Sequence, residues 1–265
     1  MKIYVFLPCY NEELNITELI NAWAKQSSAL ADLGYELIIY AIDDKSTDST
    51  RQKIEDLLCT KENLRLISHD ANKGLNGGLN TAITYFLNEG ENNSYMVLMD
   101  GDNTHDPKYI YSMIEELQKG FDCVIASRYC TSSDTIGVSK FRVFLSDMAR
   151  YYYKLMLRVP NVEDYTCGYR IYTYGIIQDV VKNFGIDPVK EKSFACMMEF
   201  LYKCYLSGAK FGEVGFKLRY DYKKGDSKMS IIKTMSKSIL VALQLRRQRK
   251  KYNMEGSLND YKNTK

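Results

Sequence analysis

Residues 95–107 read YMVLMDGDNTHDP, an apolar run that ends in the acidic triplet Asp100-Gly101-Asp102. The apolar run predicts a strand buried on both faces, and Pro107 suits the first turn of a helix that follows it. Carboxylate oxygens are suited to Mg2+ or Mn2+, which proteins hold with one or two carboxylates plus substrate phosphates. Because so short a triplet also occurs in acidic surface turns, its meaning depends on the sequence around it.

The first half of the chain alternates apolar runs with helical patterns. We expect strands over residues 3–7, 36–42, 64–68, 95–99 and 123–127. Helices are expected over residues 11–33, 47–58, 77–87 and 107–119. Such alternation predicts right-handed βαβ units in an α/β fold, with a Rossmann-like, mostly parallel sheet flanked by helices.

Polar clusters follow three of these strands. Residues 8–12 (PCYNE) follow the first strand, Asp43-Asp44 follow the second, and the acidic triplet follows the fourth. Ligands of parallel α/β sheets bind outside the carboxyl ends of the strands. We therefore expect the three clusters to meet in one crevice.

The second half of the chain is less regular. We expect helices over residues 140–158 and 193–207, a loop over 163–170 and a strand over 213–222. From residue 230 the pattern predicts a basic amphipathic helix, followed by a polar tail. We expect residues 1–229 to form the main domain and residues 230–265 an appendage. The appendage helix fits either an anionic membrane surface or ordinary packing on the domain.

Composition and charge bound the function classes. The formal net charge of +3 does not by itself imply a nucleic-acid partner, and none is expected. The seven cysteines are scattered without a CxxC pair, which indicates a reducing compartment. No signal peptide or membrane-spanning run is visible, so we expect a cytoplasmic protein, peripheral at the cytoplasmic face of a membrane. A homo-oligomer is left open.

Six segments resemble, in order, the motifs of the inverting family 2 glycosyltransferases. They are LPCYNE (7–12), IDDKSTDST (42–50), NKGLNGGLN (72–80), MDGDNTHDP (99–107), ASRY (126–129) and DYTCGYR (164–170). The pattern is most similar to the dolichyl-phosphate mannose synthase and polyprenyl-phosphate glycosyltransferase branch of the family. This resemblance implies a GT-A fold and transfer of a hexose from a GDP- or UDP-linked sugar, with Mg2+ or Mn2+ as cofactor.

The resemblance also implies roles for individual residues. Nucleotide-sugar contacts are expected at Pro8, Tyr10, Glu12, Asp43, Asp44, Lys73, Asp100 and Gly101. Metal ligands are expected at Asp100, Asp102 and Thr104, where the related synthases commonly carry Gln in the third position. Catalytic roles are expected for Asp102, Arg128, Asp164, Arg170 and Lys228.

The acceptor depends on which charges surround the site. A sugar hydroxyl needs a general base, for which Asp164 or Glu199 would serve. A lipid phosphate is already anionic and needs cations, here Arg128, Arg170 and Lys228. The cations favour a polyprenyl phosphate acceptor, with a saccharide hydroxyl in cell-surface polysaccharide assembly as the alternative. A non-catalytic nucleotide-binding subunit is a further alternative.

Overall fold

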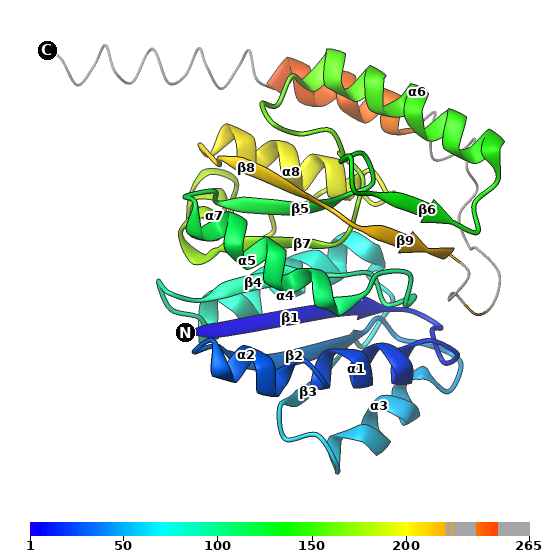
Figure 1. The fold of residues 1–265 in the computed structure, drawn as a ribbon, viewed down its shortest axis with the longest axis vertical. Helices are drawn as coiled ribbons and strands as arrows, with labels where there is room; N and C mark the ends of the chain where they lie inside the picture. Colours follow the sequence, from blue (N-terminus) through cyan, green and yellow to red (C-terminus); the bar gives the residue numbers. More distant parts are fainter. Residues whose placement is uncertain (221–223, 225–236, 249–265) are drawn as a thin grey trace, which may run out of the picture.

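A seven-stranded sheet forms the centre of the molecule (Figure 1). The computed structural model describes residues 1–220, 224 and 237–248. The strands of the central sheet are β1 (Lys2–Cys9), β2 (Glu36–Asp43), β3 (Leu64–Ser68), β4 (Tyr95–Leu98), β5 (Cys123–Ser127), β7 (Arg170–Thr173) and β8 (Phe211–Gly215). Their spatial order is β3-β2-β1-β4-β7-β5-β8, and every neighbouring pair is parallel except those that β7 makes with β4 and β5.

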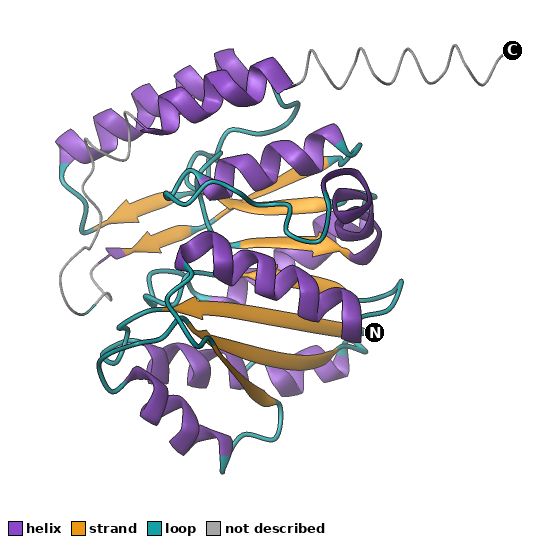
Figure 2. Ribbon diagram, turned by 180° about the vertical axis from the view of Figure 1, so that it is seen from behind, coloured by secondary structure: helices purple, strands orange, loops and turns teal. Residues whose placement is uncertain are grey.

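Helices cover both faces of the sheet. They are α1 (Ile16–Ala24), α2 (Ser27–Asp32), α3 (Thr50–Leu58), α4 (Gly74–Glu89), α5 (Ile110–Gln118), α6 (Lys140–Leu157), α7 (Tyr174–Phe184) and α8 (Cys196–Leu206). A short 3-10 helix, η1 (Pro107–Tyr109), precedes α5. Helix α5 lies in front of the sheet in Figure 1 and α4 in front of it in Figure 2, which shows the molecule from behind. The predicted α/β sheet flanked by helices is confirmed.

The core explains why the apolar runs became strands. The residues of β1 from Ile3 to Leu7 are at most 1% exposed, and Trp23 of α1 is fully buried. The Trp23 ring stands edge-on to Tyr169 at 6.1 Å, and its indole N–H donates to the sulfur of Met99 at 3.4 Å. A strand buried on both faces has to be apolar throughout, which is why these runs show no alternation.

Three predicted elements differ from the structure. The expected helix over 11–33 is two helices, α1 and α2, and Asn11 lies before them in a left-handed turn with φ of 55°. Residue 170 is expected to end a loop but begins β7, which enters the sheet antiparallel and leads into α7, an element that the sequence pattern did not indicate. The expected strand over 213–222 is two strands, β8 in the main sheet and β9 (Lys217–Arg219), which pairs in parallel with β6 (Asp134–Ile136).

Helix α6 and the helical residues 237–248 lie side by side as an outer layer (Figures 1 and 2). The Tyr153 and Ser238 hydroxyls lie 2.5 Å apart, and the Tyr152 hydroxyl donates to the carbonyl of Ile239 at 3.2 Å. The predicted boundary at 229/230 and most of the predicted tail fall outside the described residues. Among the residues that the structure describes, no helix is long and apolar enough to cross a membrane.

Candidate active site

The three polar clusters meet where β1, β2 and β4 end side by side. Strand β1 is the central strand of the three, and Cys9 stands opposite Asp43 in the parallel register. The Asp44 amide then donates to the carbonyl of Cys9 at 2.9 Å. Residues 8–12, Asp43-Asp44 and the acidic triplet therefore lie together at this edge of the sheet, which is the position expected for the crevice.

The triplet lies tightly against its neighbours. A Cβ added to Gly101 would stand 3.0 Å from the carbonyl oxygen of Pro8, so the small residue lets the triplet pack on the end of β1. A Cβ added to Gly168 would stand 2.6 Å from Asp100 Oδ2. Gly168 thus leaves a space that the Asp100 carboxylate occupies.

Asp102 is joined to a buried chain of side chains. Its Oδ1 accepts hydrogen bonds from the Thr104 hydroxyl at 2.7 Å and the Thr104 amide at 3.2 Å. The same hydroxyl lies 3.1 Å from His105 Nδ1, and His105 Nε2 lies 3.4 Å from the Cys167 sulfur. Burial lowers the pKa of His105 to about 4, so the ring is neutral at pH 7. Thr104, predicted as a metal ligand, is buried and orients Asp102 in this structure.

The turn over residues 10–12 is held by the loop after β2. Asn11 Oδ1 accepts from the Thr47 amide at 2.8 Å, and the Asn11 amide donates to the Ser46 hydroxyl at 3.0 Å. The Glu12 amide donates to Thr50 at 2.8 Å. Tyr10 is 39% exposed, so part of its side chain is accessible to solvent.

Asp43 and Asp44 are both buried but have different surroundings. Asp44 accepts from the amides of Lys73 and Gly74 at 2.8 Å each and lies 2.7 Å from His69 Nδ1. Its two oxygens therefore fix the start of α4. Asp43 accepts from the Ser46 amide at 3.1 Å, three residues further along in the loop that follows β2. Of the pair predicted to contact the nucleotide, Asp43 keeps that expectation and Asp44 has a structural task.

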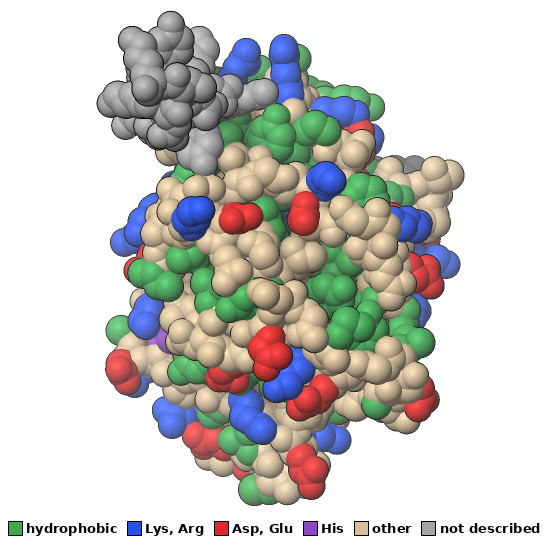
Figure 3. Space-filling model, turned by 90° about the vertical axis from the view of Figure 1, so that its left-hand side faces the viewer, with side chains coloured by type: hydrophobic (Ala, Val, Ile, Leu, Met, Phe, Trp, Pro, Cys, Tyr) green, Lys and Arg blue, Asp and Glu red, His purple; other side chains and the backbone are tan. Residues whose placement is uncertain are grey.

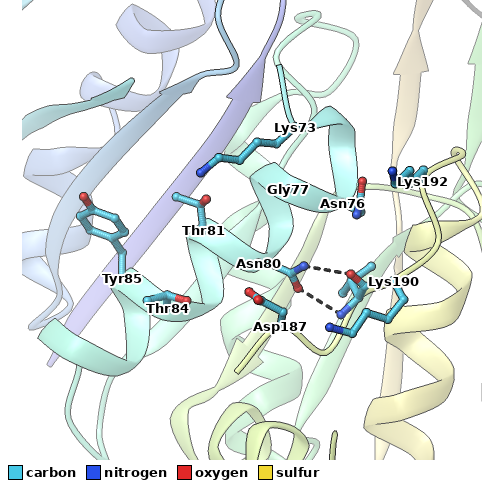
Figure 4. A pocket seen from close by; sticks show the side chains of 11 residues that line it. Lys73, Asn76, Gly77, Asn80, Thr81, Thr84, Tyr85, Asp187, Lys190 and Lys192 are labelled. Atoms are coloured by element: carbon cyan, nitrogen blue, oxygen red, sulfur yellow. Dashed lines mark hydrogen bonds between the residues drawn. The ribbon is translucent and has the colours of Figure 1, made fainter. Parts of the chain in front are cut away.

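Lys73 stands before α4 and lines an open hollow of about 520 Å³. Figure 4 shows α4 residues on one wall and Lys190 and Lys192 on the other. Asn80 joins the walls, because its side chain donates to the Val189 carbonyl at 2.9 Å and accepts from the Val189 amide at 3.0 Å. The hollow does not include the acidic triplet, so it lies beside the crevice and is not its centre.

Arg128 and Asp164 form a bidentate ion pair. Arg128 Nε donates to Asp164 Oδ2 at 2.7 Å and Nη2 to Oδ1 at 2.6 Å, while Nη2 also donates to the Thr166 hydroxyl at 2.7 Å. Burial disfavours the ionised carboxyl, but the Arg128 charge and the hydrogen bonds prevail and hold the pKa of Asp164 at about 2. The Asp164 side chain is fully buried, whereas that of Arg128 is 23% exposed, so Arg128 is the member of the pair that solvent reaches.

Arg170, also predicted to be catalytic, lies inside the core. The Arg170 side chain is fully buried and donates to the carbonyls of Met197 and Tyr165 at 2.8 and 2.9 Å. It supports the core beneath the site and is not accessible to an acceptor. Lys228 lies outside the described residues.

Glu199, the alternative base, is also occupied. Its Oε1 lies 2.6 Å from Lys203 Nζ, and its Oε2 accepts from the amides of Lys190 and Glu191 at 2.9 and 2.8 Å. Lys203 also donates to the carbonyl of Pro188 at 2.5 Å. This buried pair holds the segment that forms one wall of the hollow.

Sequence reasoning missed several polar residues that shape the site. His69 is buried and lies between Asp44 and Thr81. Glu213 accepts from the amides of Glu163 and Asp164 at 2.7 and 2.8 Å. His69 directly follows β3, so the rule on the carboxyl ends of strands would have found it. Glu213 offers no such signal, because it lies within a strand.

A mostly parallel sheet with carboxylates gathered at its strand ends is typical of ligand-binding α/β enzymes. The model of glycosyl transferase family 2 matches residues 4–181. The chain therefore belongs to glycosyl transferase family 2, as the six sequence segments predicted.

Individual relatives agree with this family. The chain is 29% identical over 204 residues to a dolichol-phosphate mannosyltransferase of Pyrococcus furiosus, covering 77% of this chain and 53% of that protein. It is 25% identical over 230 residues to a polyprenol monophosphomannose synthase of Mycolicibacterium smegmatis, covering 86% and 81%. The chain thus spans about half the length of the archaeal relative.

A solved structure shares the fold. The mannosyltransferase PcManGT from Pyrobaculum calidifontis, in complex with GDP-Man and Mn2+, superposes with a TM-score of 0.53 at 14% identity and covers 93% of this chain and 73% of its own. At this identity the likeness supports the GT-A fold alone.

Proposed function

We propose that this chain transfers a hexose from a GDP- or UDP-linked sugar to a polyprenyl phosphate, with inversion at the sugar. The observation that carries the choice of acceptor is the state of the two candidate bases. Asp164 is locked in an ion pair with Arg128, and Glu199 is bonded to Lys203 and two amides. A hydroxyl acceptor needs a base, whereas a phosphate monoester does not. The structure therefore supports an acceptor that arrives already anionic.

The nucleotide-sugar donor is proposed to bind around the acidic triplet. Tyr10, Glu12 and Asp43 are proposed to border the nucleoside, with Pro8 and Gly101 as the floor beneath the diphosphate. A GDP- or UDP-linked donor and a divalent metal are proposed here, and the solved structure that shares the fold is described in complex with GDP-Man and Mn2+. Lys73 is proposed to contact the donor from the start of α4.

Asp100 and Asp102 suit Mg2+ or Mn2+. Both side chains offer hard oxygen ligands. Because residue 168 is a glycine, the Asp100 carboxylate occupies space that a side chain at position 168 would otherwise take. Within the described residues, no group of three or more His, Cys, Asp or Glu side chains forms a metal cluster of its own. A bound metal would neutralise charge on the departing nucleoside diphosphate. The Thr104 hydroxyl, which also contacts His105, donates to Asp102 Oδ1 and restrains that carboxylate.

Arg128 is proposed to bind the acceptor phosphate. Asp164 and Thr166 already hold its guanidinium in place, so the Arg128 side chain loses little conformational entropy when it binds an anion. Asp164 has its pKa lowered to about 2 and remains ionised, so it positions Arg128 and does not take a proton. Lys228 is kept as a further proposed cation. The relatives described as mannosyltransferase and mannose synthase support a lipid acceptor, and with it residence at the cytoplasmic face of a membrane.

The test is a transfer assay with radiolabelled GDP-mannose and a panel of UDP-hexoses, Mn2+ and a short-chain polyprenyl phosphate. We expect label in an acid-labile lipid product, and loss of at least about a hundredfold in rate for Arg128→Gln. Arg128→Lys is the matched control, because it keeps the positive charge but loses the bidentate guanidinium, and its transfer rate should be intermediate. Label found only in oligosaccharide, with Arg128→Gln unaffected, would contradict the phosphate acceptor.

A further inference from the structure

Helix α6 carries a stripe of large apolar side chains on the outside of the molecule. Five of them, Phe141, Phe144, Met148, Tyr151 and Leu155, are each more than half exposed. Their spacing of three and four residues places them along one face of the helix. Large apolar side chains gathered on one exposed face mark an interaction surface, whereas scattered ones are ordinary.

The neighbouring helix widens this surface. Residues 237–248 lie against α6, and their side chains Ile239, Leu240 and Leu243 are 38%, 60% and 40% exposed. Val241, Ala242 and Leu245 of the same helix are buried, so its inner face already packs on the domain. The two helices together therefore present an outer apolar surface, which we call the α6 face.

The charges at the α6 face are mostly positive. Helix α6 contains four basic residues and one acidic residue, although Arg150 and Lys154 both pair with Glu163. Residues 237–248 contain three basic residues and none that is acidic. Lys154, Arg158, Lys237, Arg246 and Arg247 are exposed. At the top of Figure 3, hydrophobic side chains lie beside Lys and Arg side chains. An apolar face bordered by cations is complementary to a bilayer surface that contains anionic lipid.

The inner side of α6 is tied to the proposed acceptor residue. The Tyr129 hydroxyl lies 2.7 Å from the Ser146 hydroxyl of α6, and Arg150 stacks over the Tyr129 ring at 4.5 Å. Arg150 also donates to Glu163 at 2.8 Å, one residue before Asp164. The helix that carries the apolar stripe is thus fastened to the residues next to Arg128 and Asp164.

We infer that the α6 face rests on an anionic bilayer, with its apolar side chains in the interfacial region and its cations among the lipid head groups. This inference builds on the proposed function, because a membrane-borne acceptor phosphate would then reach Arg128 from the surface on which the enzyme sits. It differs from the sequence prediction, which considered a membrane contact only for residues 230–265, with ordinary packing as the alternative. Here α6 supplies five of the eight exposed apolar side chains named above.

The test measures binding of the full chain to vesicles. Wild type is sedimented with vesicles of equal parts phosphatidylcholine and phosphatidylglycerol, and with vesicles of phosphatidylcholine alone. We expect binding to the mixed vesicles that weakens with salt, and weaker binding to the neutral ones. Phe144→Ser combined with Leu155→Ser removes two apolar side chains from the face and should lower the partition coefficient at least about tenfold.

A matched control separates the α6 face from general hydrophobicity. Leu33 and Ile186 are 57% and 54% exposed, close to Phe144 and Leu155 at 59% and 57%, and none of these four is buried in the core. Leu33→Ser combined with Ile186→Ser should leave vesicle binding unchanged. Thermal unfolding of all variants checks that each is folded. Equal vesicle binding by the two double variants, or no binding by wild type, would overturn the inference.

Two further readouts distinguish the other outcomes. If the α6 face instead joins two copies of the chain, wild type sediments as a dimer without vesicle binding and Phe144→Ser/Leu155→Ser is a monomer, which overturns the inference. With a water-soluble short-chain polyprenyl phosphate, the same variant should keep wild-type transfer. If wild type transfers to no lipid phosphate, the proposed function fails while the vesicle result still decides the membrane contact.

Discussion

Asp164 is completely buried, and both of its carboxylate oxygens accept hydrogen bonds from neighbouring groups. Its folded pKa of about 2 lies below the ordinary value of 3.8, so its ionised form is stabilised by folding. A depressed carboxyl pKa contributes stability that is present above the unfolded pKa and lost as pH falls through the folded one. For Asp164 this window runs from about pH 4 to about pH 2, and the contribution is on the order of 2 kcal/mol.

We therefore expect Asp164→Asn to lower the free energy of unfolding at pH 7 by at least about 2 kcal/mol, because Arg128 loses its counter-charge. The difference from wild type should shrink as the pH falls from 4 toward 2. Urea unfolding at several pH values measures both effects. Asp106→Asn is the control, since Asp106 pairs with Lys108 on the surface and should matter little. A constant difference between wild type and Asp164→Asn across this window would contradict the assignment.

Thr104 is expected to affect metal affinity through Asp102. Thr104→Val keeps the shape but removes the hydroxyl that donates to Asp102 and contacts His105. We expect Mn2+ affinity in the presence of nucleoside diphosphate to fall about tenfold, as for other residues that orient metal ligands. Isothermal titration with Mn2+ measures it, and Thr104→Ser should restore most of the affinity. Unchanged affinity in Thr104→Val would remove Thr104 from the site.

At the scale of elements, the sequence predicted best what local pattern controls. The apolar runs at β1, β2, β3 and β5 are bounded by turn residues, and the structure places strands there within two residues of the expected limits. Strand β7 was missed because its four residues (RIYT) carry no periodicity, and they join the sheet antiparallel through contacts distant in sequence. The break between α1 and α2 was missed because no Gly or Pro marks it.

The site also combines features that follow from the sequence with features that depend on distant contacts. The crevice at the ends of β1, β2 and β4 follows from topology, so it could be predicted from residue order alone. The burial of Arg170 could not, because it depends on α8 and the 165 loop closing over β7. In the same way, only the packed structure reveals that Asp164 and Glu199 are already occupied by partners.

Gly168 gives a prediction at the junction of two elements. It joins the Asp164 loop to the acidic triplet, and a Cβ there would meet the Asp100 carboxylate at 2.6 Å. We expect Gly168→Ala to displace Asp100 and weaken metal-dependent binding of the nucleotide about tenfold or more, with a smaller effect on stability. Gly175→Ala in α7 is the matched control, since a Cβ there meets nothing within 4 Å. Equal nucleotide binding by the two variants, measured by titration with Mn2+ present, would show that Asp100 tolerates the added methyl group.

For the whole molecule, the proposed donor site connects segments that are far apart in sequence. Residues 8–12, 43–46 and 100–104 come from three βα units, and the 164–168 loop comes from the second half of the chain. A ligand that binds these segments together binds only the folded state. Its binding free energy therefore adds to the global stability, in proportion to how far its concentration exceeds the dissociation constant.

We expect Mn2+ with the cognate nucleoside diphosphate, at about a hundred times its dissociation constant, to stabilise the fold by about 2.7 kcal/mol. In a protein of this size that corresponds to a rise in Tm of roughly 5 °C. Chelation of the metal with EDTA should remove most of the rise, because the diphosphate charge then faces Asp100 and Asp102 without a cation between them. Asp102→Asn isolates the cause, since it should unfold near the wild-type temperature without ligand yet show little metal-dependent shift. A full shift in Asp102→Asn, or an equal shift with EDTA, would mean that the nucleotide binds independently of the triplet.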